Sequence, residues 1–156
     1  MNRDLREVYI VDGCRTPFLK ARGTPGPFSA SDLAVFAGRQ LLSAMPFAPS
    51  ALDEVVLGCV VPSVDEANIA RLVALRLGCG KGVPGFTVQR NCASGLQALD
   101  CAYKDIAMGR HELVLAGGTE AMSRAPLLYN DKMVQWLSEL YAAKNLPARL
   151  KQFLKF

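Results

Sequence analysis

Residues 86–98 read FTVQRNCASGLQA and contain, in order, a short apolar run, a polar turn and the start of a longer apolar segment. The run at 86–90 predicts a strand, because aromatic and β-branched residues favour extended backbone. The turn at 91–95 contains a glycine, and the segment after it is apolar on nearly every face until Gly109. A helix of that kind lies buried between layers. The stretch therefore predicts a strand joined to a buried helix, with Cys92 in the turn between them.

The same alternation of strand and helix extends along the chain on both sides of this unit. Short β-rich runs predict further strands at residues 8–11, 53–61 and 112–116. Apolar residues at helical spacing predict two amphipathic helices, one that begins at Ser29 or Ser31 and one around residues 70–77. This order of elements predicts an α/β fold, in which helices pack on the faces of a sheet.

The pattern changes after Pro126. Residues 131–143 and 147–156 predict two helices with no strand between them, and most of the positive charge excess of the chain lies in this region. We therefore divide the chain into an α/β domain at 1–125 and a helical segment at 126–156.

The overall composition excludes several classes of protein. Hydrophobic residues make up 51% of the 156 residues and charged residues 21%, which is typical of a globular domain and not of a disordered chain. The net charge of +4 is small, and the part of it carried by residues 1–128 is too small for a nucleic-acid-binding surface, which needs clustered Lys and Arg on one face. No run of about eighteen apolar residues occurs, so no membrane span is predicted. Residues 1–13 show neither a secretory nor a transit-peptide pattern.

The chain has five cysteines, and none of them forms a C-x-x-C pair. The single histidine, His111, does not complete a zinc-binding set with them at the usual ligand spacing, so no metal site is predicted. Reduced thiols are the simplest interpretation, and they indicate a reducing compartment, the cytoplasm. Cys59 and Cys101 lie within apolar patterns and are predicted to be core residues, and Cys14 and Cys79 are given no functional role.

Cys92 is the candidate catalytic residue. It lies where a strand ends and a helix begins, and there the unpaired backbone N–H groups and the helix dipole stabilise a thiolate. A thiolate in this position can act as a nucleophile. The residues alone leave open the alternative that Cys92 is a buried cysteine that packs as a small apolar side chain.

A thiolate nucleophile usually needs a general base, and His111 is the only histidine in the chain. Cys92 precedes the predicted helix and His111 follows it, so at about 1.5 Å per residue they are roughly 25 Å apart. We therefore expect the two at opposite edges of the sheet, with His111 as a solvated loop residue. The base for Cys92 then comes from outside this chain or from a partner.

Two phosphate-binding motifs are absent. Residues 78–82 (GCGKG) are rich in glycine but do not complete the G-x-x-x-x-G-K-[ST] pattern, and we interpret them as a loop. A C-x5-R phosphatase loop that began at Cys92 would need an arginine where Ala98 stands.

Five motifs, taken together and in order along the chain, resemble the amino-terminal part of the thiolase family. They are VYIV (8–11) with RTPF (15–18), DEVVLG (53–58), NIAR (68–71), VQRNCASGLQA (88–98) and AGGTEAMS (116–123). The resemblance covers residues 6–126, and five motifs in the family's order are far more specific than any one of them.

The resemblance implies a thiolase-like amino-terminal half, a mixed β-sheet with helices on both faces, followed by the helical start of the family's loop domain. It implies an acyltransferase in which Cys92 carries the acyl group as a thioester, with its backbone N–H in an oxyanion hole. Coenzyme A or acyl-CoA is then the substrate, and no cofactor is bound permanently. The implied reaction is thiolysis of a 3-ketoacyl-CoA, as in β-oxidation of fatty acids, or condensation of two acetyl-CoA molecules.

In this family a histidine in a Gly-His-Pro motif and a second cysteine in a Cys-x-Gly motif complete the site, and neither motif occurs in these 156 residues. The chain therefore resembles a truncated thiolase, and we expect little turnover beyond acylation of Cys92. The resemblance further implies a homo-oligomer, a dimer or tetramer, formed through the strand Phe86 to Arg90, and a possible partner in the family's carboxyl-terminal half. Two alternatives stay open: a non-catalytic thiolase-like fragment that binds a partner or an acyl chain, and another condensing enzyme of this fold, such as a ketoacyl synthase. The sequence sets neither the acyl-chain length nor the direction of the reaction.

Overall fold

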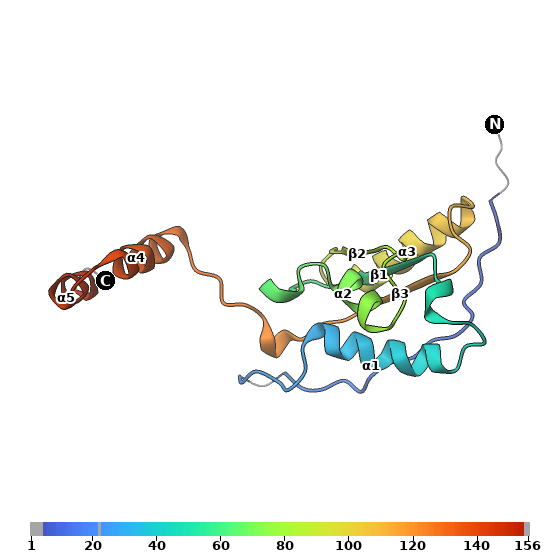
Figure 1. Ribbon diagram of the computed structural model, residues 1–156, viewed down its shortest axis with the longest axis horizontal. Helices are drawn as coiled ribbons and strands as arrows, with labels where there is room; N and C mark the ends of the chain where they lie inside the picture. The colour runs from blue at the N-terminus through green and yellow to red at the C-terminus, as the bar shows by residue number, and fades with distance from the viewer. Residues whose placement is uncertain (1–4, 22, 155–156) are drawn as a thin grey trace. The chain divides into compact units, whose positions relative to one another are not determined.

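The structure is a computed structural model and describes residues 5–21 and 23–154 (Figure 1). Its helices and strands, in chain order, are α1 (Ala30–Ser43), β1 (Glu54–Gly58), α2 (Ile69–Arg76), β2 (Gly85–Val88), α3 (Ser94–Ala107), β3 (Val114–Gly118), α4 (Asp131–Ala142) and α5 (Leu146–Phe153). Short 3-10 turns lie at Pro49–Ala51, Val64–Glu66 and Met122–Arg124. The chain divides into two units, Met1–Pro126 and Leu127–Phe156. The assignment of residues 126–156 to the start of a loop domain stays a prediction.

The three strands form one parallel sheet in the order β2-β1-β3. Val56, in the middle of β1, is paired with Phe86 on one side and with Ala116 on the other. The chain leaves β1 for β2 through α2 and then returns across β1 to β3 through α3. Because right-handed crossovers in opposite directions place their helices on opposite faces, α2 and α3 cover different faces of the sheet. Figure 1 shows α1 and α3 on opposite sides of the strands.

β1 is buried along its whole length, since it lies between two other strands and between two layers of helices. Val55 and Leu57 belong to the apolar cluster that α1 and α2 form on one face, with Val73 among its fully buried members. Side chains alternate between the faces of a strand, so Val56 and Gly58 face α3. A parallel strand buried on both faces is a continuous apolar run, which is why the sequence indicates it clearly.

Several sequence predictions for the first unit are confirmed, but the expectation that the helix after Cys92 is buried between layers is wrong. α3 buries only the face with Ala98, Ala102 and Ala107, whose small side chains pack toward the sheet, while Leu96 and Leu99 are exposed. Ser29 is the N-cap of α1: its side chain accepts a hydrogen bond from the Asp32 backbone, and the Asp32 carboxylate accepts one from the Ser29 backbone. α3 ends just before Gly109, whose φ of 71° lies in the region that favours glycine. The fold class is an α/β sheet with helices on both faces, as expected. All three strands of the described residues are parallel, so an antiparallel strand that would make the sheet mixed is not among them.

The strand predicted at residues 8–11 is wrong. Within the described residues this segment joins no sheet, and Tyr9, Ile10 and Val11 are exposed to 73%, 88% and 72%. It lines an apolar cavity of about 510 Å³ together with β3, α1 and α3. A strand requires a neighbour that takes its backbone hydrogen bonds, and a β-rich composition does not supply one.

The second unit consists of α4 and α5, close to the two helices predicted there. They are joined by a hydrogen bond of 2.9 Å from the Trp136 indole N–H to the Gln152 carbonyl, and the rings of Trp136 and Phe153 meet edge to face with centroids 5.5 Å apart. No helix among the described residues is both long enough and apolar enough to cross a bilayer.

Candidate functional site

Cys92 lies in the turn that joins β2 to α3, at the edge where the parallel strands end. Asn91, the residue before it, has a left-handed backbone with φ of 49°, a conformation that asparagine adopts more readily than most residues. Ser94 closes the turn, because its hydroxyl donates to the Asn91 carbonyl at 2.7 Å and accepts from the Arg90 N–H at 2.8 Å. The turn is therefore held by its own side chain and backbone groups, while Cys92 stays exposed.

Three glycines allow α3 to come close to the strands at this edge. Gly58 and Gly118 end β1 and β3, and Gly95 lies in the first turn of α3. A Cβ on Gly58 would lie 2.3 Å from the backbone carbonyl of Ser94, and a Cβ on Gly118 would lie 3.0 Å from the Cα of Gly95. Backbone packing therefore fixes the start of α3, and with it the turn that carries Cys92.

The start of α3 lies directly beside this turn, and the N–H groups of Ala93 and Ser94 donate to the carbonyls of Arg90 and Asn91 at 3.1 Å each. Its N-cap residue, Ala93, offers no side-chain hydrogen bond to the first turn of the helix. The first N–H groups of a helix have no partner within it, and its dipole gives that end a positive potential. The arrangement suits a thiolate, or a negatively charged oxygen, next to the helix start.

Cys59 lies at the same edge of the sheet but in a different environment. It is buried just after β1, and its thiol lies 3.6 Å from one carboxylate oxygen of Glu120. The other oxygen of Glu120 accepts from the Val60 N–H at 2.8 Å. Burial, together with the negative charge of Glu120, raises the pKa of the Cys59 thiol to about 12. Cys59 is therefore a protonated core thiol near neutral pH, as predicted.

The remaining three cysteines differ in their exposure. Cys79 is buried, and burial raises the pKa of its thiol. Cys101 was expected in the core and is only half-buried, and the Gln97 amide donates to its sulfur at 3.4 Å. Cys14 is exposed.

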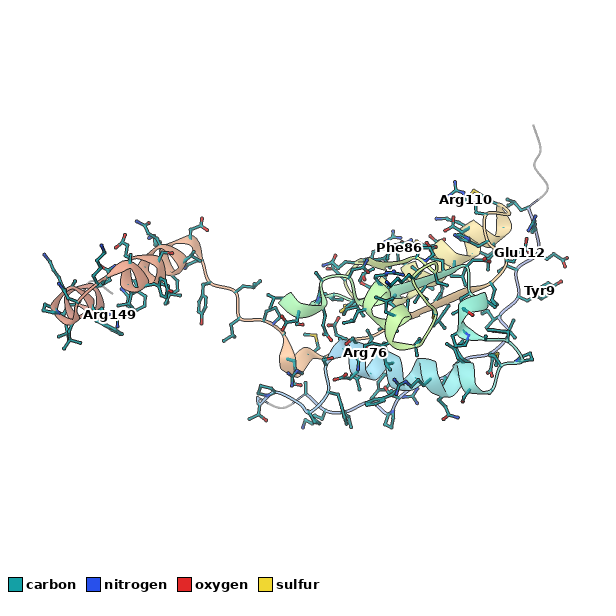
Figure 2. The ribbon with its side chains drawn as sticks, viewed as in Figure 1. Tyr9, Arg76, Phe86, Arg110, Glu112 and Arg149 are labelled. Carbon is teal, nitrogen blue, oxygen red and sulfur yellow. The ribbon has the colours of Figure 1, made fainter. Side chains whose placement is uncertain are left out.

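His111 lies at the other edge of the sheet from Cys92, as expected. It precedes β3, whose first residue, Val114, is paired with Glu54, the first residue of β1. The amino and carboxyl ends of parallel strands lie at opposite edges, so His111 does not reach Cys92. Arg110 and Glu112, the chain neighbours of His111, lie at one end of the first unit in Figure 2.

His111 lies in a loop, as expected, but the expectation that it is solvated is wrong. Its side chain is only 25% exposed, and its Nε2 lies 3.6 Å from a carboxylate oxygen of Glu54. Burial raises the pKa of the Glu54 carboxyl, the charge of His111 opposes this change, and the charge of Asp105 adds to it. No sequence signal points to this group, because its members come from β1, α3 and a loop.

Comparison with known proteins gives the family. Residues 8–148 match the family described as the thiolase N-terminal domain. The chain therefore belongs to the thiolase family, whose members are acyltransferases. The β-ketoadipyl-CoA thiolase of Pseudomonas knackmussii is 46% identical over 123 residues, and the mitochondrial 3-ketoacyl-CoA thiolase of Homo sapiens is 42% identical over 123 residues. Each alignment covers 78% of this chain and 31% of the relative, so the chain spans about a third of these relatives' length.

Solved thiolase structures share the fold of the first unit. The acetyl-CoA acetyltransferase of Bacillus anthracis superimposes with a TM-score of 0.64 at 39% identity, over 68% of this chain and 27% of the other. The human mitochondrial 3-ketoacyl-CoA thiolase in complex with CoA gives a TM-score of 0.63 at 40% identity, over the same shares of the two chains.

Proposed function

We propose that Cys92 is the acyl-accepting nucleophile of a thiolase-type acyltransferase site. The observation that carries this proposal is an exposed thiol in a fixed turn directly before the start of α3. Family membership supports it, since residues 88–98 resemble the motif around the family's acylated cysteine. Of the two exposed cysteines, Cys92 is the one in the turn directly before the start of α3.

The proposed first step transfers an acyl group from acyl-CoA to Cys92. The thiolate attacks the carbonyl carbon of the thioester, a new carbon–sulfur bond forms, and the bond to the CoA sulfur breaks. CoA leaves as a thiolate and takes up the proton that the Cys92 thiol gave up. The Cys92 N–H and the positive end of the α3 dipole stabilise the negative oxygen of the tetrahedral intermediate. This step needs no resident cofactor, because CoA and acyl-CoA are the reactants.

The second step passes the acyl group from Cys92 to CoA or to a second acyl-CoA. The relatives named above are 3-ketoacyl-CoA and β-ketoadipyl-CoA thiolases, and one solved relative is a complex with CoA. We therefore propose that in condensation C2 of a second acyl-CoA loses a proton and attacks the acyl carbon on Cys92, so that a carbon–carbon bond forms and the Cys92 thiolate leaves. Thiolysis of a 3-ketoacyl-CoA is the reverse: the Cys92 thiolate attacks C3, the bond between C2 and C3 breaks, acetyl-CoA leaves after C2 takes up a proton, and CoA then removes the acyl group from Cys92. Degradative use in fatty-acid oxidation is one such role. The five free thiols support a reducing compartment, for which we propose the cytoplasm.

The 156 residues do not supply a histidine base to Cys92, because the only histidine lies at the opposite edge of the sheet. General acid–base catalysis typically contributes about 10²- to 10⁴-fold to a rate. We expect acylation of Cys92 by this chain to be slow and turnover to be correspondingly low. The base would come from a longer protein or from a partner chain.

Mass spectrometry after incubation of the chain with acetyl-CoA tests the proposal. We expect one acetyl group on the peptide that contains Cys92, removed again by free CoA. The Cys92→Ser variant should lose the modification. Cys14→Ser is the matched control, since Cys14 is also exposed but lies far along the chain from the turn, and it should retain the modification. Equal acetylation of Cys14 and Cys92, or none at Cys92, would contradict the assignment.

A second candidate function is favoured by the apolar cavity between residues 8–14 and β3. One edge of β3 is unpaired among the described residues, and the walls of the cavity come from α1 and α3. We propose that, in a chain without catalytic partners, this groove binds an extended apolar segment of another polypeptide as an added strand. The partly exposed Leu99 of α3 lies in its wall.

Fluorescence of a hydrophobic dye tests this candidate. We expect the unchanged chain to bind the dye, Leu99→Asp to reduce binding several-fold, and Leu127→Asp, an exposed leucine of the other unit, to leave it unchanged. A chain that binds no dye and forms only monomers would contradict the proposal.

We also propose a homo-oligomer that forms through β2. This strand lies at an edge of the sheet and has β1 as its only sheet neighbour among the described residues. An open edge presents unpaired N–H and C=O groups, to which the same strand of a second copy can pair about a two-fold axis.

A further inference from the structure

Three potential metal ligands meet at the edge of the sheet opposite Cys92. Glu54 is the first residue of β1, Asp105 lies in the last turn of α3, and His111 lies in the loop before β3. One carboxylate oxygen of each acid and one ring nitrogen of His111 all lie within 4.8 Å of one another. Neither the family match nor the Cys92 chemistry assigns a role to this group.

The surroundings of the group favour a cation. The side chains of Glu54, Asp105 and His111 are 11%, 17% and 25% exposed, so two carboxylates lie close together with little solvent around them. Burying negative charges in this way is costly unless a positive charge is present. Arg110 partly neutralises Asp105 through a contact of 3.1 Å to one of its oxygens, which leaves the other oxygen available.

His111 does not donate a hydrogen bond to the Glu54 carboxylate. The separation of 3.6 Å between Nε2 and the Glu54 oxygen exceeds hydrogen-bond length, and it matches the spacing of two ligands on one ion. Bonds of about 2.1 Å in a tetrahedral arrangement place ligand atoms about 3.4 Å apart. Because all the ligand atoms lie within 4.8 Å of one another, no pair has to close by more than about 1.4 Å to reach that value.

The backbone around the group is held in place before any ion binds. Asp53, next to Glu54, accepts hydrogen bonds from the N–H groups of Glu112 and Leu113 at 2.7 and 2.9 Å. The Arg110 N–H donates to the Asp105 carbonyl at 2.9 Å. The loop that carries His111 is therefore fixed on both sides, as a metal site of defined geometry requires.

We propose that Glu54, Asp105 and His111 bind a divalent transition-metal ion of the zinc type, with water as a fourth ligand. Imidazole nitrogen and carboxylate oxygen are both ligands that Zn²⁺ accepts, and two carboxylates balance its charge. The ion would join the end of α3 to the starts of β1 and β3. This proposal does not depend on acylation of Cys92.

Metal titration of the full chain, without any polyhistidine tag, tests the site. His111 is the only histidine, so a single imidazole contributes to the proton NMR spectrum. We expect Zn²⁺ to shift its ring signals at one equivalent and Co²⁺ to broaden them. Bound Co²⁺ should show visible bands of a four-coordinate ion without the near-ultraviolet charge-transfer band that thiolate ligands give.

Variants separate this site from binding elsewhere. We expect His111→Asn and Asp105→Asn to weaken Zn²⁺ binding at least about 100-fold, since even the loss of an outer partner of a ligand typically costs 10–100-fold. Glu112→Gln is the matched control, because Glu112 is exposed and pairs with Arg6. The Zn²⁺ affinity of this variant should equal that of the unchanged chain. Circular dichroism identifies any variant that fails to fold. No binding at one equivalent, binding that persists in a folded His111→Asn chain, or a thiolate band with Co²⁺ would overturn the proposal.

Discussion

A thiol reacts according to its exposure and to the ease with which it loses its proton, and the cysteines of this chain differ in both. Cys14 and Cys92 are exposed, whereas Cys59 and Cys79 are buried and have raised pKa values. We expect iodoacetamide to modify Cys14 and Cys92 in the folded chain and to reach Cys59 and Cys79 only after unfolding. Peptide mass spectrometry over a time course measures this order. Rapid labelling of Cys59 in the folded chain would contradict the structure.

Glu66 provides a prediction about stability and pH. It is buried beside the start of α1, where burial acts to raise the pKa of its carboxyl, but hydrogen bonds from Ser29, Ser31 and Ser63 outweigh burial and lower the pKa. The Ser29 hydroxyl donates to it at 2.6 Å. Glu66→Gln replaces one carboxylate oxygen, which accepts hydrogen bonds, by an NH₂ group that can only donate. Since the serine groups around it are donors, we expect a loss of about 1–3 kcal/mol in the free energy of unfolding at pH 7.

The sign of the pH effect follows from the lowered pKa. A carboxyl whose pKa is lower in the folded chain stabilises it fully above its ordinary value of 4.5, and this contribution is lost as the pH falls through the folded value. The difference between Glu66→Gln and the unchanged chain should therefore shrink below about pH 4.5 in urea titrations. The exposed Glu112→Gln variant provides the reference. A difference that grows in acid would refute the assignment.

The sequence predicts the position and contacts of some single residues and not of others. The position of Cys92 was predictable, because a strand, a turn and a helix that are adjacent in the chain define it. The contacts of Glu66, and the group of Glu54 and His111, were not predictable, since each joins segments that only the folded chain brings together. The sequence pattern of neighbouring residues predicts local geometry. Contacts between charged residues that are far apart in the chain can be identified only from the tertiary structure.

At the scale of elements, the contact between α3 and the sheet depends on glycines at the strand ends. We expect Gly58→Ala to lower the free energy of unfolding by about 3 kcal/mol or more, because its Cβ would lie 2.3 Å from rigid backbone of Ser94. Gly82→Ala is the control, since an added Cβ there meets nothing within 4 Å, and its effect should stay within about 0.5 kcal/mol. Urea unfolding of both variants measures the difference. Equal stability of the two would contradict the close packing of α3.

The elements themselves were predicted with one clear failure. The start of α1 at Ser29 and the extent of α3 follow from capping residues and apolar spacing, which act within a few residues. The strand expected at residues 8–11 has the right composition, yet within the described chain it has no neighbour. A helix makes its own backbone hydrogen bonds, whereas a strand depends on residues far away in the chain.

At the scale of the whole molecule, the open edge of β2 provides a prediction about assembly. We expect the chain to sediment as a dimer or a larger oligomer, and Phe86→Lys to shift it toward the monomer, because a lysine on an edge strand opposes pairing. Leu127→Lys, in the other unit, should leave the assembly unchanged. Analytical ultracentrifugation over a range of concentrations measures both. A monomer at the highest soluble concentration of the unchanged chain would argue against this interface.

The position of β1 at the centre of the sheet also sets the order in which the molecule can fold during synthesis. β1 is the first of the three strands to leave the ribosome, and its neighbours, β2 and β3, are made later. Val56, whose side chain faces α3 and which pairs with Ala116 of β3, therefore stays in contact with water until β3 has emerged from the exit tunnel. During that interval the nascent chain exposes part of an apolar strand, which makes it a substrate for chaperones that bind extended apolar segments.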